Sequence, residues 1–131
     1  MARIAVIDDE ESVRRLLQLV LELEEHEVLL AEDGVQGLDM IRREHPDLIV
    51  LDVMMPSMDG LTMLKQLHAG EKAHGIPVLV LTAATLRAVA VELLGSGADQ
   101  VMTKPFDPAN VVMAVNDLLA VYQRQVSTSG G

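Results

Sequence analysis

The stretch that decides the fold is DLIVLDVMMPSMDG, residues 47–60. Its first half, residues 48–51, is a continuous run of Leu, Ile and Val, which is typical of a strand buried on both faces of a sheet. Asp52 ends this run, and burial there would oppose its ionisation unless cations or hydrogen bonds compensated the charge. Residues 54–56 then break the strand, before an amphipathic helix that we expect Asp59 to cap.

Outward from this stretch, strand-like apolar runs alternate with helix-period segments along the whole chain, which predicts a parallel α/β sheet. The expected strands are residues 3–7, 27–31, 48–51, 77–81 and 98–102, with a helix after each. Right-handed crossovers place helices on both faces, so we expect a doubly wound five-stranded parallel sheet. In this interpretation residues 1–124 form one domain, and residues 125–131 form a flexible tail or linker.

Composition narrows the function classes. The chain has 131 residues and no cysteine, which excludes disulfides and thiolate chemistry. A net charge of -10 argues against direct nucleic-acid binding, because phosphate backbones attract Lys and Arg patches. No apolar run approaches the ~20 residues that span a bilayer, and the amino terminus does not resemble a signal peptide. We therefore expect a cytoplasmic protein without membrane contact.

Acidic, hydroxyl and ammonium side chains lie at the carboxyl ends of four predicted strands. They are Asp8, Asp9, Asp52, Thr82 and Lys104. Ligands of doubly wound sheets bind beyond the carboxyl ends of the strands, so these residues predict one shared site.

The chemistry of this set favours phosphoryl transfer. Three neighbouring carboxylates repel one another unless a hard cation intervenes, and Mg²⁺ suits such a site because it prefers oxygen ligands. One carboxylate can then act as a nucleophile toward a phosphoryl group while the others hold the metal. Lys104 and Thr82 offer an ammonium group and a hydroxyl for the charge that develops on the phosphoryl oxygens.

Four motifs in order give the chain a specific resemblance. They are Asp8-Asp9 after the first strand, LIVLDVMMPSMDG around Asp52, LTA at residues 81–83, and GADQVMTKPF at residues 97–106. The sequence resembles the receiver domain of a two-component response regulator from residue 3 to about residue 124. The resemblance implies the flavodoxin-like strand order 2-1-3-4-5. It also implies a signalling switch that catalyses only its own phosphoryl transfer and dephosphorylation, and not an enzyme acting on other substrates.

The resemblance also assigns roles at the acidic site. Asp52 would accept a phosphoryl group from the phosphohistidine of a sensor histidine kinase or phosphotransfer protein. Asp9 would ligate Mg²⁺ directly, Asp8 through water, and the backbone carbonyl of Met54 would contribute. Thr82 would be the switch hydroxyl.

Lys104 would pair with the phosphoryl group, and the Lys104-Pro105 bond would be cis. Receivers usually carry Tyr or Phe three residues before this lysine, and here Val101 takes that position. We therefore expect phosphorylation to act mainly through a shift of the fourth helix, residues 85–95. This helix is apolar on most sides, so it is either deeply packed or part of a surface, shared with the fifth strand and the last helix, for an output domain or a homodimer.

Three other functions share parts of this pattern, and one of them is kept as an alternative. Because of Val101, a degenerate receiver that acts as a constitutive interaction module is an alternative. An aspartate-nucleophile phosphatase usually has another Asp two residues after the nucleophile, where this chain has Met54. A flavin carrier would need a hydroxyl- and glycine-rich loop after the first strand, whereas residues 8–11 are all acidic here and would repel the cofactor phosphate.

Arg14 and Arg15 form a small basic pair on the first predicted helix. They are interpreted as solvated residues that pair with nearby Glu.

Overall fold

The fold is a five-stranded parallel sheet with helices on both faces, seen here in a computed structural model. The structure describes residues 2–52, 65, 75–82, 94–95 and 98–129. The elements are β1 (Arg3–Ile7), α1 (Glu11–Leu23), β2 (Glu27–Ala31), α2 (Gly34–Glu44), β3 (Leu48–Asp52), β4 (Val78–Thr82), β5 (Gln100–Thr103) and α5 (Pro108–Ser129). The strands are arranged in the order β2-β1-β3-β4-β5, which confirms the predicted order.

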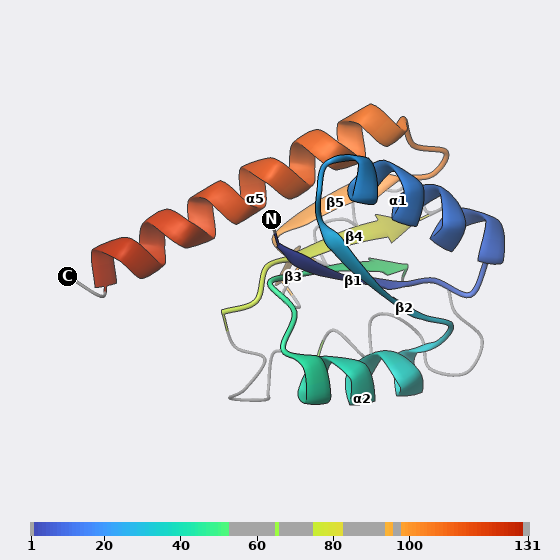
Figure 1. The fold of residues 1–131 in the computed structure, drawn as a ribbon, viewed down its shortest axis with the longest axis horizontal. Helices are drawn as coiled ribbons and strands as arrows, with labels where there is room; N and C mark the ends of the chain where they lie inside the picture. The colour runs from blue at the N-terminus through green and yellow to red at the C-terminus, as the bar shows by residue number, and fades with distance from the viewer. Residues whose placement is uncertain (1, 53–64, 66–74, 83–93, 96–97, 130–131) are drawn as a thin grey trace.

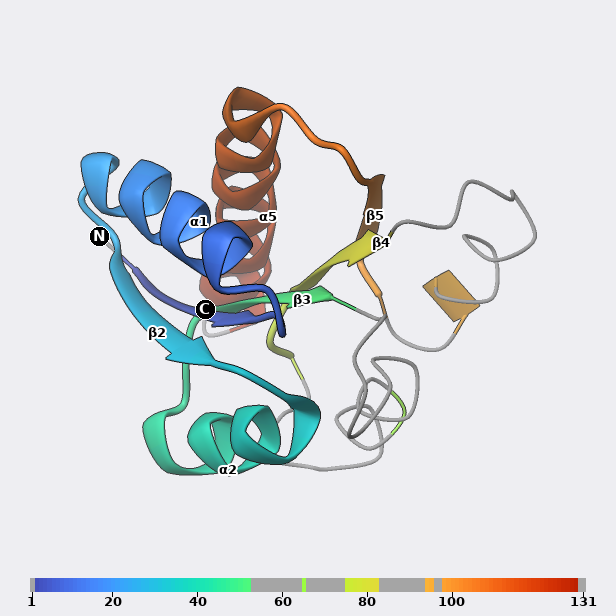
Figure 2. The same ribbon diagram turned by 90° about the vertical axis from the view of Figure 1, so that its right-hand side faces the viewer.

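The two faces of the sheet carry two separate cores because successive strand residues point to opposite sides. In β3, Ile49 and Leu51 pack in the core that includes Leu38 and Ile41 of α2. The alternate β3 residues pack in the second core, together with Leu17 and Leu21 of α1 and Val111 and Val115 of α5. Figures 1 and 2 show the same layers, with α1 and α5 on one side of the sheet and α2 on the other.

Helix ends follow local sequence signals. Asp33 caps α2, where its side chain accepts a hydrogen bond from the Gln36 backbone N–H at 2.8 Å. Asp107 precedes Pro108, the first residue of α5, and its side chain accepts from the Ala109 backbone N–H at 2.9 Å. The predicted start of the last helix is therefore confirmed.

Two boundaries differ by two or more residues from the sequence prediction, whereas both ends of β4 and the last residues of β3 and β5 differ by one. β5 begins at Gln100, two residues later than expected, because at Asp99 the carboxylate takes the Val78 N–H at 2.8 Å, although the Asp99 backbone N–H donates to the Val78 carbonyl at 2.9 Å. α5 continues to Ser129 and therefore includes residues 125–129 of the expected tail. No glycine or proline interrupts this segment before Gly130, and the last turns project beyond the sheet (Figure 1).

Several predicted features lie outside the described residues. These are the helix after Asp52 with its proposed cap Asp59, and most of the fourth helix. Leu94 and Gly95 of the fourth helix are described and helical, and Leu94 is 49% exposed.

Candidate functional site

The strand register brings the predicted site residues to one edge of the sheet. Ile7 of β1 pairs with Leu51 of β3, so the next residues of the two strands, Asp8 and Asp52, arrive at the same level. Thr82 ends the neighbouring strand β4, and Lys104 directly follows β5. The Lys104 backbone N–H donates to the Thr82 carbonyl at 2.7 Å, which ties the last two strand ends together.

Lys104 is the cation at the centre of this edge. Its Nζ donates to Asp8 Oδ2 at 3.0 Å and lies 3.3 Å from Asp52 Oδ2. Burial alone would lower the pKa of Lys104, but its hydrogen bond with Asp8 and the charges of Asp8 and Asp52 raise this pKa above its ordinary value of 10.5. Lys104 therefore stays protonated and compensates buried negative charge at neutral pH.

Three carboxylates meet beside this lysine. Oxygen atoms of Asp8, Asp9 and Asp52 all lie within 4.8 Å of one another. Asp8 and Asp52 are buried, at 1% and 2% exposure, whereas Asp9 is exposed. Oxygen ligands of one Mg²⁺ lie roughly 3–4 Å apart, given metal–oxygen distances of about 2.1 Å. The donor type, spacing and partial exposure of this acidic triad therefore fit a hydrated Mg²⁺ ion.

The remaining predicted features have different outcomes. Thr82 is 1% exposed at the end of β4, as expected for a residue at this edge. The Lys104-Pro105 peptide bond is cis, which confirms the prediction. Val101 is half-buried and packs against the core on the α2 side of the sheet. Met54, whose carbonyl was expected to bind the metal, lies outside the described residues.

Two residues near the site were missed by sequence reasoning. Glu10 Oε1 lies 3.7 Å from Lys104 Nζ, and the Glu10 backbone N–H donates to Asp8 Oδ1 at 2.9 Å. α1 begins only at Glu11, so Asp8 and Asp9 are not helix caps. The second missed residue is Arg14, whose Nη1 donates to the Asp8 carbonyl at 2.7 Å.

The interpretation of Arg14 as solvated was therefore wrong, although its expected ion pair with a nearby Glu exists, with Glu32 at 3.9 Å. Its side chain is only 11% exposed, because it lies three and seven residues before Leu17 and Leu21 and shares their buried face. This spacing is the signal that could have identified it. Arg15 is 76% exposed and pairs with Glu11 one turn earlier, as expected.

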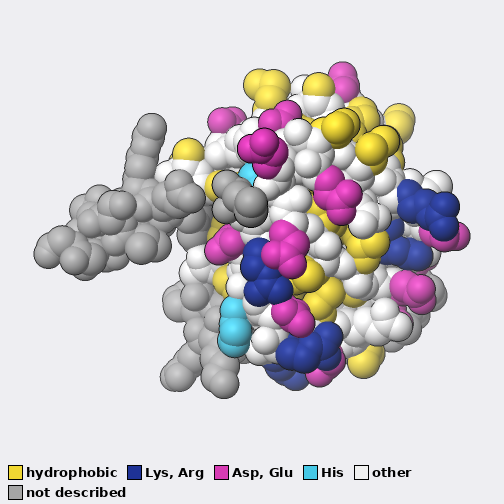
Figure 3. Space-filling view, viewed as in Figure 1, with side chains coloured by type: hydrophobic (Ala, Val, Ile, Leu, Met, Phe, Trp, Pro, Cys, Tyr) yellow, Lys and Arg dark blue, Asp and Glu magenta, His cyan; other side chains and the backbone are white. Residues whose placement is uncertain are grey.

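The overall surface is acidic rather than basic. The net charge is -10, and Figure 3 shows that the described Lys and Arg side chains on one face lie beside acidic ones rather than in a single basic patch. Among the described helices, none has both the length and the apolar character that a membrane crossing requires.

The doubly wound sheet thus carries an acidic triad and Lys104 together at its carboxyl edge. The family model of the response regulator receiver domain matches residues 4–116. The chain belongs to this family, which operates in two-component signal transduction, and receiver domains are generally signalling switches rather than enzymes.

Known relatives agree with this assignment. The chain is 44% identical over 117 residues to the alkaline phosphatase synthesis transcriptional regulatory protein PhoP of Bacillus subtilis, covering 89% of this chain and 48% of that protein. It is 43% identical over 117 residues to the response regulator PleD of Caulobacter vibrioides, covering 89% of this chain and 26% of that protein. The chain thus spans half or less of these curated relatives.

A solved structure shows the same fold over nearly its full length. The receiver domain of the Francisella response regulator 1452 has a TM-score of 0.87 and 31% sequence identity, with 95% of this chain and 99% of that chain covered.

Proposed function

We propose that this chain is the phosphoacceptor switch of a two-component system, with Asp52 as the phosphorylated residue. The observation that supports this most directly is Lys104 Nζ, which lies within 3.3 Å of both Asp8 and Asp52 while Asp9 completes the acidic triad. Asp52 is thus a buried carboxylate that can act as a nucleophile, because Lys104 beside it compensates its negative charge.

Each residue has a separate role in the proposed transfer. An Asp52 carboxylate oxygen attacks the phosphorus of a phosphohistidine on a sensor histidine kinase or phosphotransfer protein. The new P–O bond gives an acyl phosphate, the P–N bond breaks, and the imidazole of the donor leaves. Lys104 then pairs with the phosphoryl oxygens, and the Thr82 hydroxyl donates to them.

Asp8, Asp9 and Asp52, with the Met54 carbonyl, are the proposed ligands of Mg²⁺. When bound, Mg²⁺ supplies positive charge that neutralises the phosphoryl oxygens and the crowded carboxylates. Asp9 is proposed as the direct ligand because it is exposed, whereas Asp8 is already engaged by Lys104 and by the Glu10 backbone N–H. Asp8 would act through a water molecule.

The output is proposed to pass through the surface formed by the fourth helix, β5 and α5. Val101 cannot undergo the aromatic rotamer change that receivers usually couple to their threonine, so movement of the fourth helix would carry most of the signal. The two curated relatives are longer than this chain, and their names include a transcriptional regulatory protein and a response regulator. We propose that this surface contacts an output domain or a second copy of the chain.

Val101 also supports a second candidate, a receiver that acts as a constitutive interaction module. Its side chain is half-buried against the core and carries no aromatic ring, so this position offers no aromatic group that could change rotamer. Complete retention of the acidic triad, Thr82 and Lys104 favours the switch instead.

Labelling with acetyl phosphate tests the proposal. Wild-type protein with Mg²⁺ should gain the mass of one phosphoryl group, and EDTA should prevent this. Asp52→Asn should remain unlabelled because its amide is not a nucleophile. Absence of labelling in folded wild-type protein would favour the interaction module, and labelling of Asp52→Asn would reject Asp52 as the acceptor.

A further inference from the structure

Asp8 is fixed at every hydrogen-bonding position by a different partner. Its backbone N–H donates to the Ala31 carbonyl at 3.2 Å, and its carboxylate accepts from Glu10 and Lys104. The remaining group, its backbone carbonyl, accepts from Arg14 Nη1 at 2.7 Å. Arg14 is thus the only one of these partners that acts on the peptide linking Asp8 to Asp9.

This carbonyl contact has a geometric consequence for Asp9. The carbonyl of Asp8 and the nitrogen of Asp9 belong to one rigid peptide plane. A hydrogen bond that holds the carbonyl therefore fixes the orientation of the plane and the direction in which Asp9 leaves it. Asp9 is exposed and begins the loop that leads to α1, so its approach to Asp52 depends on this orientation.

We propose that Arg14 is a positioning residue of the Mg²⁺ site, which holds the Asp8-Asp9 peptide so that the Asp9 carboxylate faces Asp52. The inference rests on the proposed function, because it requires the acidic triad to bind Mg²⁺. Arg14 reaches no metal ligand oxygen of the triad in the described contacts; it acts through the backbone. Its side chain is 11% exposed, and a short, nearly buried charged hydrogen bond of this kind is stronger than an exposed one.

The contact of Arg14 with Glu32 does not account for its placement. Arg14 Nη2 lies 3.9 Å from Glu32 Oε1, and the Glu32 side chain is 68% exposed, so this ion pair is long and hydrated. Glu32→Gln should therefore change Mg²⁺ affinity little. The hydrogen bond to the Asp8 carbonyl, at 2.7 Å, is therefore the contact that accounts for the placement of Arg14.

The direction in which Mg²⁺ affinity changes when Arg14 is replaced distinguishes a positioning role from a purely electrostatic one. Arg14 carries a positive charge near a cation site, so loss of that charge alone would strengthen Mg²⁺ binding. Loss of a group that orients a metal ligand typically weakens metal affinity about 10-fold or more. We therefore expect Arg14→Gln to bind Mg²⁺ about 10-fold more weakly than wild type, against the electrostatic trend.

Isothermal titration of Mg²⁺ into the metal-free chain measures this directly. Arg15→Gln is the matched control, because Arg15 is the next residue on α1 and is 76% exposed. It should bind Mg²⁺ within about twofold of wild type. Arg14→Gln should also be phosphorylated by acetyl phosphate more slowly than wild type at limiting Mg²⁺, and its rate should return to the wild-type rate at saturating Mg²⁺. A general loss of structure would not be reversed by Mg²⁺ in this way.

Arg14→Lys keeps the proposal testable if Arg14→Gln does not fold. It retains the charge but lacks the planar guanidinium fork, so it should bind Mg²⁺ more weakly than wild type. Affinity equal to or above that of wild type in the folded Arg14 variants would overturn the role of Arg14 alone. Failure of the wild-type chain itself to bind Mg²⁺ would overturn the proposed metal site as well.

Discussion

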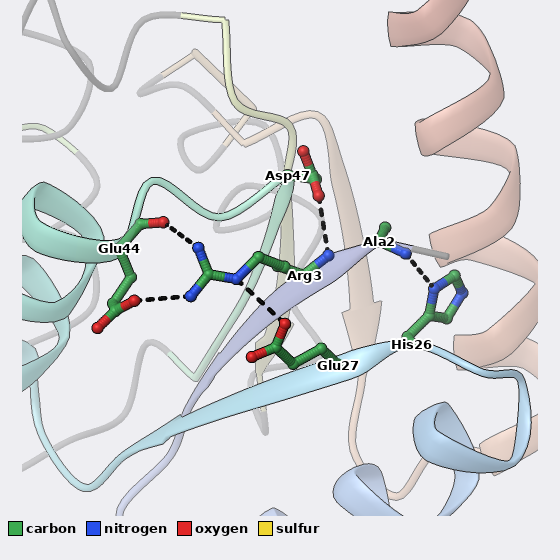
Figure 4. Close-up of polar contacts among 6 residues, drawn as sticks. All are labelled: Ala2, Arg3, His26, Glu27, Glu44 and Asp47. Carbon is green, nitrogen blue, oxygen red and sulfur yellow. Dashed lines mark hydrogen bonds and ion pairs between the residues drawn. The ribbon is translucent and has the colours of Figure 1, made fainter.

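At each end of the sheet a basic side chain pairs with acidic ones, but only one end buries those acids. At the amino end, Arg3 contacts Glu27 and Glu44, whose side chains are 58% and 35% exposed (Figure 4). At the carboxyl end, Lys104 contacts Asp8 and Asp52, whose side chains are 1% and 3% exposed. Exposed carboxylates keep their hydration, whereas buried ones depend on the cations beside them.

The contacts at the amino end are those of a structural junction. Arg3 uses two nitrogens on Glu44, one to its carbonyl and one to its carboxylate, both at 2.6 Å. The Arg3 backbone N–H donates to Asp47 Oδ2 at 2.8 Å, and the Ala2 N–H donates to His26 Nδ1 at 3.2 Å (Figure 4). These bonds join the starts of β1, β2 and β3 to the end of α2. The carboxyl end instead gathers several acids around one ammonium group.

The largest expected difference between the two ends is in Mg²⁺ affinity. Asp9→Asn replaces the negative charge of a proposed direct ligand with a neutral amide and should weaken Mg²⁺ binding by about 100-fold, at the upper end of what the loss of a supporting residue typically costs. Asp47→Asn, at the other end of β3, should bind Mg²⁺ as wild type does, and its amide oxygen can still accept the Arg3 N–H. Isothermal titration measures both, and equal affinities for the two variants would break the comparison.

A second difference concerns stability without metal. Lys104→Met leaves the buried Asp8 and Asp52 carboxylates without their ammonium partner, which should reduce the free energy of unfolding by about 1–3 kcal/mol at pH 7. Urea unfolding in EDTA, followed by circular dichroism, measures this loss. Mg²⁺ should then stabilise Lys104→Met more than wild type, because the ion replaces the missing charge.

Arg3→Met serves as the control for that experiment. It removes a partly exposed cation from the amino end, so its response to Mg²⁺ should match that of wild type. A Lys104→Met chain that is as stable as wild type in EDTA would show that the buried carboxylates do not need the lysine.

Most of the fold follows from local pattern in the sequence. The first two strands have the predicted bounds because each is a short apolar run between turn residues. The β5 boundary was missed because the Asp99 side chain, rather than the backbone, takes the Val78 N–H. The length of α5 was missed because polar residues such as Gln125 are compatible with either a helix or a tail.

The sequence predicted the site residues that lie at the ends of strands, but not the residues that reach the site from α1. Asp8, Asp52 and Lys104 meet because consecutive strands end at the same edge, which the order of motifs already indicates. Arg14 and Arg15 are adjacent residues of the same type, but only Arg14 lies at helical spacing from the buried Leu17 and Leu21. The periodicity could therefore have indicated that Arg14 is buried, whereas its contact with the Asp8 carbonyl depends on packing distances that residue types do not encode one by one.

A third difference is in the pH range in which each end loses stability. The folded pKa of Lys104 is raised above 10.5, so its stabilising effect is complete below that pH and is lost as pH rises through the raised value. In EDTA, wild type should therefore lose more stability above about pH 10.5 than Lys104→Met does. Urea unfolding at a series of alkaline pH values gives the two slopes, and parallel curves would contradict the prediction.

The smallest effect is expected at the amino end, on the acid side. The hydrogen bond from Arg3 outweighs partial burial and lowers the pKa of Glu44 below its ordinary value of 4.5. A carboxylate with a lowered pKa contributes stability that is present above that value and is lost as pH falls through the folded pKa. Glu44→Gln should therefore unfold with a shallower acid dependence below pH 4.5, while its backbone carbonyl still accepts from Arg3. Glu11→Gln, which removes an exposed partner of Arg15, is the matched control for the loss of an exposed ion pair. Because Glu44 lies at the end of the sheet opposite the acidic triad, its replacement should leave Mg²⁺ affinity unchanged, and any change would mean that the two ends are coupled through the strands.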